Sequence, residues 1–156
     1  MASFLFFAKP ATEEQLLDFE ARFGPIPSDY RWFLENFGGG GPDELPTIEN
    51  LPEEQKAFLD QAEDRTLSPS EFFLIGWDGF GDPFGIERAT GRILTEYHDC
   101  AGLVDVMAPS FEALCLEWIH GNPFHESFHN WDEERIERYH RTGDAAPLGG
   151  WPEQEY

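Results

Sequence analysis

One short stretch of the sequence collects side chains that could do chemistry. Residues 75–86, IGWDGFGDPFGI, carry the carboxylates of Asp78 and Asp82 among glycines and aromatic rings. Such a composition fits a metal-binding loop, a sugar-binding platform, a catalytic pair of carboxylates, or the turn of a β-hairpin. The choice among these four kinds of site decides whether the chain is interpreted as an enzyme or as a binding domain.

Most chemical interpretations of this stretch lack a feature that they need. A phosphate-binding loop needs a lysine or a helix start after it, whereas this loop leads into Pro83 and a predicted strand. An EF-hand needs alternating acidic positions and a closing glutamate. A glycosidase needs its two carboxylates to face each other across a cleft. We predict a hairpin turn at Asp78-Gly79, because glycine tolerates the positive φ of such turns.

Two histidines form a second candidate site. His125 and His129 are spaced i, i+4 with Glu126 after the first, which is the zinc-protease spacing when the segment is helical. The segment begins GNPFHESFH, and its Gly-Asn-Pro start favours a loop over a helix. No G-x-S-x-G nucleophile elbow occurs elsewhere. We therefore predict no metal ligands, no cofactor and no catalytic residues, and a protein that is not an enzyme.

The net charge limits the class of partner. The chain has 31 acidic and 10 basic side chains, a formal charge of −21 and a pI near 4.3. Such a field repels phosphate backbones, so we predict no binding of nucleic acid. It attracts basic surfaces, and a basic protein partner is the interpretation that we follow. The alternative, that the acidity serves only solubility or a high-salt habitat, stays open.

Composition also indicates the compartment. Cys100 and Cys115 lack CxxC spacing, and a reducing cytosol suits both thiols. The N-terminal MASFLFFAKP has no basic region before an apolar stretch of about five residues, which is too short for a signal peptide. No apolar run reaches the length of a membrane span. We predict a cytoplasmic protein that does not enter a membrane.

The first 41 residues predict a pair of helices. Thr12 and Gln15 have the spacing of a capping box, and Gly24 marks the end of the first helix. Pro25 and Pro27 favour an extended link, after which Ser28 is expected to cap a second helix that ends at four glycines, 38–41. The apolar stripes of the pair comprise Leu16, Phe19, Phe23, Tyr30, Phe33, Leu34 and Phe37.

An acidic insert at about 42–70 separates this pair from a run of strands. The insert is irregular, with a helix expected from about Pro52 that turns Phe58, Leu59 and Ala62 inward. Four short strands follow, within 71–77, 83–88, 91–98 and 102–107, and their short connections predict an antiparallel meander.

Two more helices and a tail complete the chain. Ser110 is expected to cap a helix that ends at Gly121, with Phe111, Leu114, Cys115, Trp118 and Ile119 on its inner face. A polar helix is expected at about 130–141, followed by a loose tail at about 142–156. We predict one domain, 1–156, of class α+β: a mostly antiparallel β-sheet packed against an N-terminal helical pair and C-terminal helices.

Three blocks of sequence together resemble a known family. FEARFGPIPSDYRWFLENFGGG is similar to the opening signature of the SUKH superfamily of Smi/Knr-like domains. The matching elements are Phe23-Gly24, the link Pro25 to Pro27, Asp29-Tyr30, Phe33-Leu34 and Gly38-Gly39. FFLIGWDGFGDPFGIERATGRILTEYHD resembles the family's hairpin block, and APSFEALCLEWI resembles its S-F helix. The resemblance covers residues 12–119, about two-thirds of the chain.

The resemblance implies both a fold and a function. Its fold is α+β, with a mostly antiparallel sheet against helices. Its bacterial members are chiefly immunity proteins of polymorphic and contact-dependent toxin systems, which bind and neutralise a cognate toxin, often a nuclease. The family carries no catalytic residues, so none is transferred to this chain. The alternative is a regulatory scaffold resembling the yeast cell-wall-assembly regulator.

We expect the partner to be bound by acidic side chains of the insert and by one aromatic ring. The predicted partner-binding residues are Asp43, Glu44, Glu49, Glu53, Glu54 and Phe80. The carboxylates would steer a basic partner, and Phe80, at the predicted hairpin tip, would anchor it. The alternative is that Phe80 folds back onto the sheet and that the acidic residues only solubilise the chain.

Overall fold

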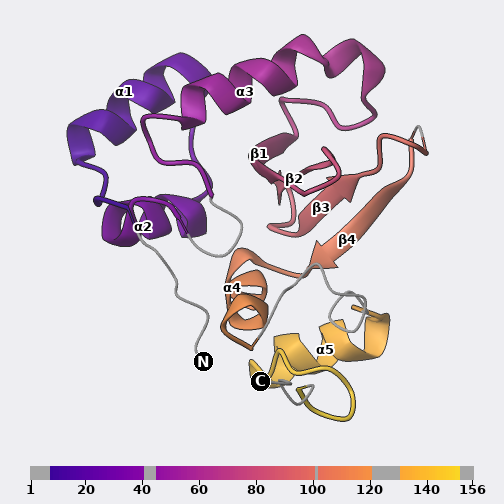
Figure 1. Cartoon of the computed structure of the whole chain (residues 1–156). Coiled ribbons are helices and arrows are strands. Elements are labelled where there is room, and N and C mark those ends of the chain that lie inside the picture. The colour runs from indigo at the N-terminus through magenta and orange to yellow at the C-terminus, as the bar shows by residue number, and fades with distance from the viewer. Residues whose placement is uncertain (1–7, 41–44, 101, 121–130, 152–156) are drawn as a thin grey trace.

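The computed structural model describes residues 8–40, 45–100, 102–120 and 131–151 (Figure 1). Its helices are α1 (Glu13–Phe23), α2 (Ser28–Phe37), α3 (Leu51–Asp60), the 3₁₀ turn η1 (Ala62–Asp64), α4 (Phe111–His120) and α5 (Glu133–Thr142). Its strands are β1 (Phe72–Trp77), β2 (Pro83–Glu87), β3 (Ile93–Glu96) and β4 (Val104–Ala108). The strands pair antiparallel in the order β1-β2-β3-β4, so the predicted α+β class and the meander are confirmed.

The two N-terminal helices begin in different ways. At α1, Gln15 N donates to Thr12 Oγ1 (3.2 Å) and Thr12 N donates to Gln15 Oε1 (2.9 Å), so the predicted capping box is confirmed. At α2 the cap is Pro27, which makes no side-chain hydrogen bond. The predicted Ser28 cap is wrong, because Ser28 already has helical backbone and its hydroxyl lies inside the first turn.

The sheet is buried on both faces because successive strand residues point to opposite sides. The main core joins one face to α1, α2 and α4. Its buried strand residues are Phe73, Ile75, Phe84, Ile86, Ile93, Met107 and Ala108. On the other face Phe72, Leu74 and Leu94 form a second cluster with Phe58 of α3. The helix of the acidic insert therefore covers the side of the sheet that the N-terminal helices leave free.

Helix α3 reaches the sheet through a polar side chain as well as apolar ones. Its buried residues are Leu51, Gln55 and Phe58, and Gln55 Nε2 donates to the carbonyl of Leu74 across 2.7 Å. Leu59 is 48% exposed, so the prediction that it points inward is wrong. The 3.6-residue period of the helix turns Leu59 away from the face that carries positions 51, 55 and 58.

The C-terminal helices differ from the expectation at one apolar and one acidic position. Ser110 caps α4 as predicted, with Ala113 N donating to its Oγ across 3.1 Å. Ile119 is 59% exposed, so its predicted inward orientation is wrong, whereas Glu117 is fully buried on the same helix. Asp132 caps α5, and its Oδ1 accepts from Arg135 N at 2.8 Å.

Part of the predicted tail contacts the helices before it. Arg135 Nη2 donates to the carbonyl of Ala145 across 2.6 Å, and Ala145 is buried in the main core. The ring of Trp151 stacks on His120, with centroids 4.1 Å apart. In Figure 1 this segment follows α5 and lies below α4. Within the described part of the chain, no helix combines the length and apolarity needed to cross a membrane.

Candidate functional site

The stretch with Asp78 and Asp82 forms the loop between β1 and β2, so the predicted hairpin is confirmed. Asp78 N donates to Asp82 O across 2.9 Å, and Gly81 N donates to Asp78 O across 3.1 Å. The positive φ lies at Gly81 (86°), so its predicted place at Gly79 is wrong. The reason is that the loop spans residues 78–82 and is not a two-residue Asp-Gly turn.

The side chain of Asp78 holds this loop in one shape. Its Oδ1 accepts from Phe80 N at 2.8 Å and from Asp82 N at 2.9 Å. Phe80, whose N–H makes the first of these contacts, is 84% exposed, the largest fraction among the exposed large apolar residues that the structure describes. The alternative that Phe80 folds back onto the sheet is therefore wrong. An internally hydrogen-bonded loop thus exposes the Phe80 ring to solvent.

Asp82 ties this loop to the loop between β3 and β4. It is 5% exposed, and its Oδ1 accepts from His98 N at 2.7 Å and lies 2.6 Å from His98 Nδ1. The other ring nitrogen of His98 lies 2.9 Å from Asp99 Oδ1. The hydrogen bond to Asp82 and the charge of Asp99 raise the pKa of His98. Asp82 is thus a structural carboxylate that joins two loops.

The first turn of α3 also reaches this end of the sheet. Glu54 Oε2 accepts from Trp77 Nε1 at 2.6 Å, and Trp77 is the residue immediately before the β1–β2 loop. The guanidinium of Arg65 lies 5.8 Å from the centroid of the Trp77 ring. We call the β1–β2 loop at residues 78–82 and the described residues 97–100 and 102–103 of the β3–β4 loop, together with Glu54, Trp77 and Glu96, the hairpin end.

The predicted partner-binding residues lie as follows. Asp43 and Glu44 fall outside the described residues. The two histidines considered as metal ligands, His125 and His129, also fall outside them. Glu49 and Glu53 are exposed at the start of α3. Glu54 is half-buried against Trp77, which links this acidic turn to the loop that carries Phe80.

A buried glutamate at the hairpin end was not predicted. Glu96, the last residue of β3, is buried, and its Oε1 accepts from Thr66 N at 2.6 Å. Among the described residues its Oε2 has no hydrogen-bond partner. The sequence gives one signal for this position: Glu96 follows Leu94 at the strand period, which places it on the face that α3 covers.

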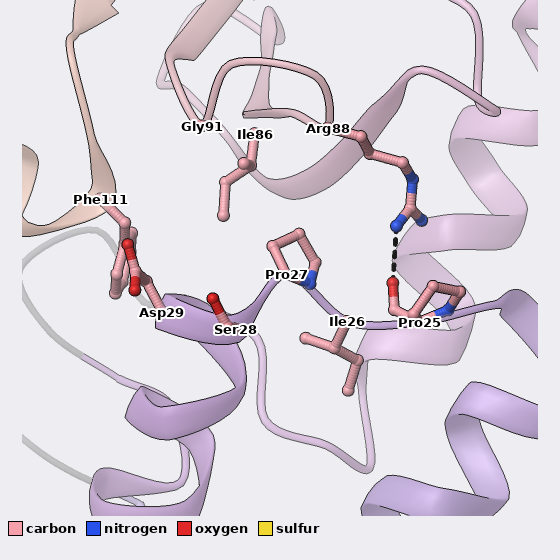
Figure 2. A pocket seen from close by; sticks show the side chains of 9 residues that line it. All are labelled: Pro25, Ile26, Pro27, Ser28, Asp29, Ile86, Arg88, Gly91 and Phe111. Carbon is pink, nitrogen blue, oxygen red and sulfur yellow. Dashed lines mark hydrogen bonds between the residues drawn. The ribbon is translucent and has the colours of Figure 1, made fainter.

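A pocket lies at the opposite end of the sheet, where the β2–β3 turn meets the link between α1 and α2. Its volume is about 370 Å³. It is lined by Pro25, Ile26, Pro27, Ser28, Asp29, Ile86, Arg88, Gly91 and Phe111 (Figure 2). Arg88 Nη1 donates to the carbonyl of Pro25 across 2.6 Å, which fixes one wall. Figure 2 shows Asp29 beside Phe111, on the side away from Arg88.

A buried ion pair joins the C-terminal helices. Glu117 Oε1 lies 3.0 Å from Arg135 Nη2 and accepts from Trp131 Nε1 at 2.8 Å, with both charged side chains 1% exposed. The Arg135 guanidinium also covers the Trp131 ring, 3.7 Å from its centroid. Burial raises the pKa of Glu117 to about 7 against the lowering effect of Arg135. This pair holds α5 against α4.

Metal ligation has no support in the part of the chain that the structure describes. Across residues 8–40, 45–100, 102–120 and 131–151, no three His, Cys, Asp or Glu side chains are placed to hold a metal ion. At the hairpin end His98 contacts Asp82 through Nδ1 and Asp99 through Nε2, so the two carboxylates lie at opposite nitrogens of the ring and do not converge on one point.

The chain forms an α+β domain. One end of its sheet carries acidic residues and the exposed Phe80 ring, and the other end carries the pocket. The sequence profile of the SMI1 / KNR4 family (SUKH-1) matches residues 10–117. The chain belongs to this family, and the predicted resemblance is confirmed. Family membership supports an immunity-protein type of domain. A comparison of the chain with individually characterised proteins gives no significant match.

The family match divides the molecule unequally. It includes both ends of the sheet and stops at Glu117. Trp131 and Arg135, which bind that carboxylate, lie beyond it. Helix α5 therefore contacts the matched part at Glu117, the last matched residue, and also through Tyr139, whose hydroxyl donates to Glu112 Oε2 across 2.7 Å.

Proposed function

We propose that the chain is a non-catalytic, cytoplasmic immunity protein that neutralises a basic toxin of a bacterial polymorphic or contact-dependent toxin system. Family membership and the formal charge of −21 support this function. The protein acts by occlusion. Its acidic surface imitates the phosphate field that a basic nuclease binds, and it occupies that site.

The observation that carries this proposal is the exposure of Phe80 on an internally hydrogen-bonded loop. A large apolar side chain that is 84% exposed gains free energy when a partner covers it. Asp78 already holds the loop in one conformation, so binding orders little additional backbone. Aromatic side chains in such positions are frequent hot spots of interfaces.

The carboxylates act before contact. Asp43, Glu44, Glu49, Glu53 and Glu54 attract the partner and raise the association rate, and salt weakens this effect because the screening length is about 8 Å at physiological ionic strength. Glu54 has a second role, since it holds Trp77 next to the loop. Substitution of Glu54 by Gln keeps the acceptor for Trp77 and removes only the charge.

The test is the kinetics of binding to the toxin, taken as the product of the adjacent gene that co-purifies with the chain. Replacing Asp43, Glu44, Glu53 and Glu54 by their amides is expected to slow association about tenfold at low salt and to flatten its salt dependence. A matched control removes four exposed charges elsewhere, at Glu14, Glu133, Glu134 and Glu137, and is expected to change the rate far less.

Phe80→Ala is expected to speed dissociation from the toxin about 30-fold while leaving association unchanged. If neither salt nor the four amide substitutions changed the association rate, the acidic turn would not be part of the interface. A complex that forms without inhibiting the toxin would favour the regulatory scaffold instead.

The non-catalytic part of the proposal has its own test. We predict that the chain does not use His125 and His129 to hold zinc. Calorimetry with zinc at micromolar protein is expected to show no stoichiometric heat, and a one-to-one isotherm that His125→Ala abolishes would contradict this.

A further inference from the structure

The pocket at the end of the sheet opposite the hairpin end has no role in the proposed occlusion. Consecutive connections of an antiparallel meander leave at alternate ends, so the β2–β3 turn and the hairpin end lie on different sides of the molecule. A volume of about 370 Å³ is within the range of sites that bind organic groups. A ligand of this pocket would therefore bind apart from the partner at the hairpin end.

The walls of the pocket are apolar over most of their length. Ile26, Ile86 and Phe111 are buried core residues that reach its surface, and Pro25 and Pro27 complete the link side. Figure 2 shows Ile86 and Pro27 facing each other across the cavity. Proline fixes φ in the link, so this wall loses little conformational freedom when it is covered. The walls fit an aliphatic side chain.

Arg88 places a half-buried cation beside these walls. Its Nη1 is bound to the Pro25 carbonyl, and the guanidinium lies 5.3 Å from the centroid of the Phe73 ring. In the described part of the chain no carboxylate lies within ion-pair distance of Arg88. The neighbouring Glu87 instead accepts a hydrogen bond from the Thr90 hydroxyl. A guanidinium remains charged at neutral pH and has donors suited to a carboxylate.

From this charge complementarity we propose that the pocket binds a peptide segment of a partner protein, with an aliphatic side chain in the cavity and an adjacent carboxylate on Arg88. The carboxylate is a side chain or the chain terminus of that segment. Asp29 lines the far side of the pocket and repels a second negative charge there. The site thus selects a single carboxylate and disfavours phosphate, and its partner need not be the basic toxin.

The test uses the smallest probe that carries both groups, N-acetylleucine, with N-acetylleucinamide as the probe that lacks only the charge. Amide NMR shifts of the ¹⁵N-labelled full chain report occupancy at Ile26, Ser28, Ile86 and Gly91. N-acetylleucine is expected to shift these signals to saturation at millimolar concentration, and the amide to bind about tenfold more weakly. Inorganic phosphate at the same concentration is expected to leave them in place.

Two variants complete the test. Arg88→Gln keeps a donor for the Pro25 carbonyl and is expected to bind both leucine probes equally weakly. Arg92→Gln, an exposed arginine in the same turn that does not line the pocket, is expected to behave like the parent. Equal affinity of the parent for the two leucine probes, or shifts that do not saturate, would overturn the proposal. Loss of toxin binding in the Phe80→Ala variant does not bear on it, because the probes do not touch the hairpin end.

Discussion

The two ends of the sheet are built from the same meander and present opposite surfaces. At the hairpin end, loops project, and carboxylates hold them by accepting backbone N–H groups, as Asp78 and Asp82 do. At the pocket end, the β2–β3 turn and a proline-fixed link meet and leave a hollow that is bordered by Arg88. The connections at residues 78–82 and 88–92 are equally long, so the neighbouring element decides the shape: the link between α1 and α2 packs beside the second turn and completes a concave surface.

The comparison also separates charge that stabilises from charge that faces solvent. Asp82 and Glu96 are buried and accept hydrogen bonds, so both are part of the fold at the hairpin end. Glu49 and Glu53 are exposed, which leaves their charge available to a partner. An acidic composition alone does not distinguish these roles. The buried carboxylates must be left intact in any variant that is meant to test binding.

The largest expected effect is on the stability of the hairpin end. Asp82→Ala removes a buried carboxylate that accepts from His98 N and contacts His98 Nδ1, and hydrogen bonds to a charged group of this kind make the expected loss about 2–3 kcal/mol of unfolding free energy. Urea denaturation measures this loss. The leucine probe is still expected to bind at the pocket end, because Asp82 does not line that pocket. An Asp82→Ala protein as stable as the parent would show that the two loops do not depend on each other.

A pair of glycines in the same loop gives the next largest effect. Gly81→Val forces a β-branched residue into φ near +86° and is expected to cost about 1–3 kcal/mol. Gly79→Val is the matched control: Gly79 has no positive φ, and no atom lies within 4 Å of an added Cβ. Its melting temperature is expected to stay close to that of the parent. The reverse order of the two melting temperatures would place the strained residue at Gly79.

Local rules predicted the elements, because capping and turn chemistry depend on neighbours in the sequence. The box at Thr12, the cap at Ser110 and the hairpin at residues 78–82 all follow from such rules. The errors at Leu59 and Ile119 have a different cause. Both stand at the exposed edge of an apolar stripe, and the width of the buried face depends on what packs against the helix.

The contacts that position the candidate site could not be predicted from the sequence. Asp82 and His98 are 16 residues apart, and Glu54 and Trp77 are 23 apart. Their pairing depends on which strands meet and on which end each loop leaves the sheet. The burial of Glu117 could not be predicted either, because it lies on a helix whose other inward residues are apolar. Its partners Trp131 and Arg135 are 14 and 18 residues further along the chain. The place of Phe80 at the tip of a turn favoured its exposure but left open that it folds back onto the sheet, and only the structure decided between the two.

A smaller effect is expected at the pocket end. Arg88→Ala removes the hydrogen bond to the Pro25 carbonyl and the contact with the Phe73 ring, which costs about 1 kcal/mol of unfolding free energy. Thermal denaturation measures it, with Arg92→Ala as the control. Association with the toxin is expected to stay at the parent rate, since the hairpin end is intact. A large drop in that rate would mean that the two ends belong to one interface.

The smallest expected effect is the pH dependence of the link between the two loops. The pKa of His98 is raised in the folded protein, mainly by its hydrogen bond to Asp82 and further by the charge of Asp99, while the charge of Arg65 opposes the shift. A histidine whose folded pKa exceeds the unfolded value of about 6.5 adds stability below that pH. The contribution is lost as the pH rises through the folded pKa.

The measurement is therefore a difference between two proteins. The parent is expected to exceed His98→Gln in unfolding free energy by more at pH 6 than at pH 9, because only the protonated ring gains from both carboxylates. Asp99→Asn is expected to reduce this pH-dependent difference only in part, since the hydrogen bond to Asp82 remains the largest cause of the shift. NMR titration of the His98 ring in the parent and in Asp99→Asn gives the folded pKa directly. A pKa at or below 6.5 in the parent would show that the ring and Asp82 do not pair in solution, and the link between the two loops would then rest on the His98 N–H alone.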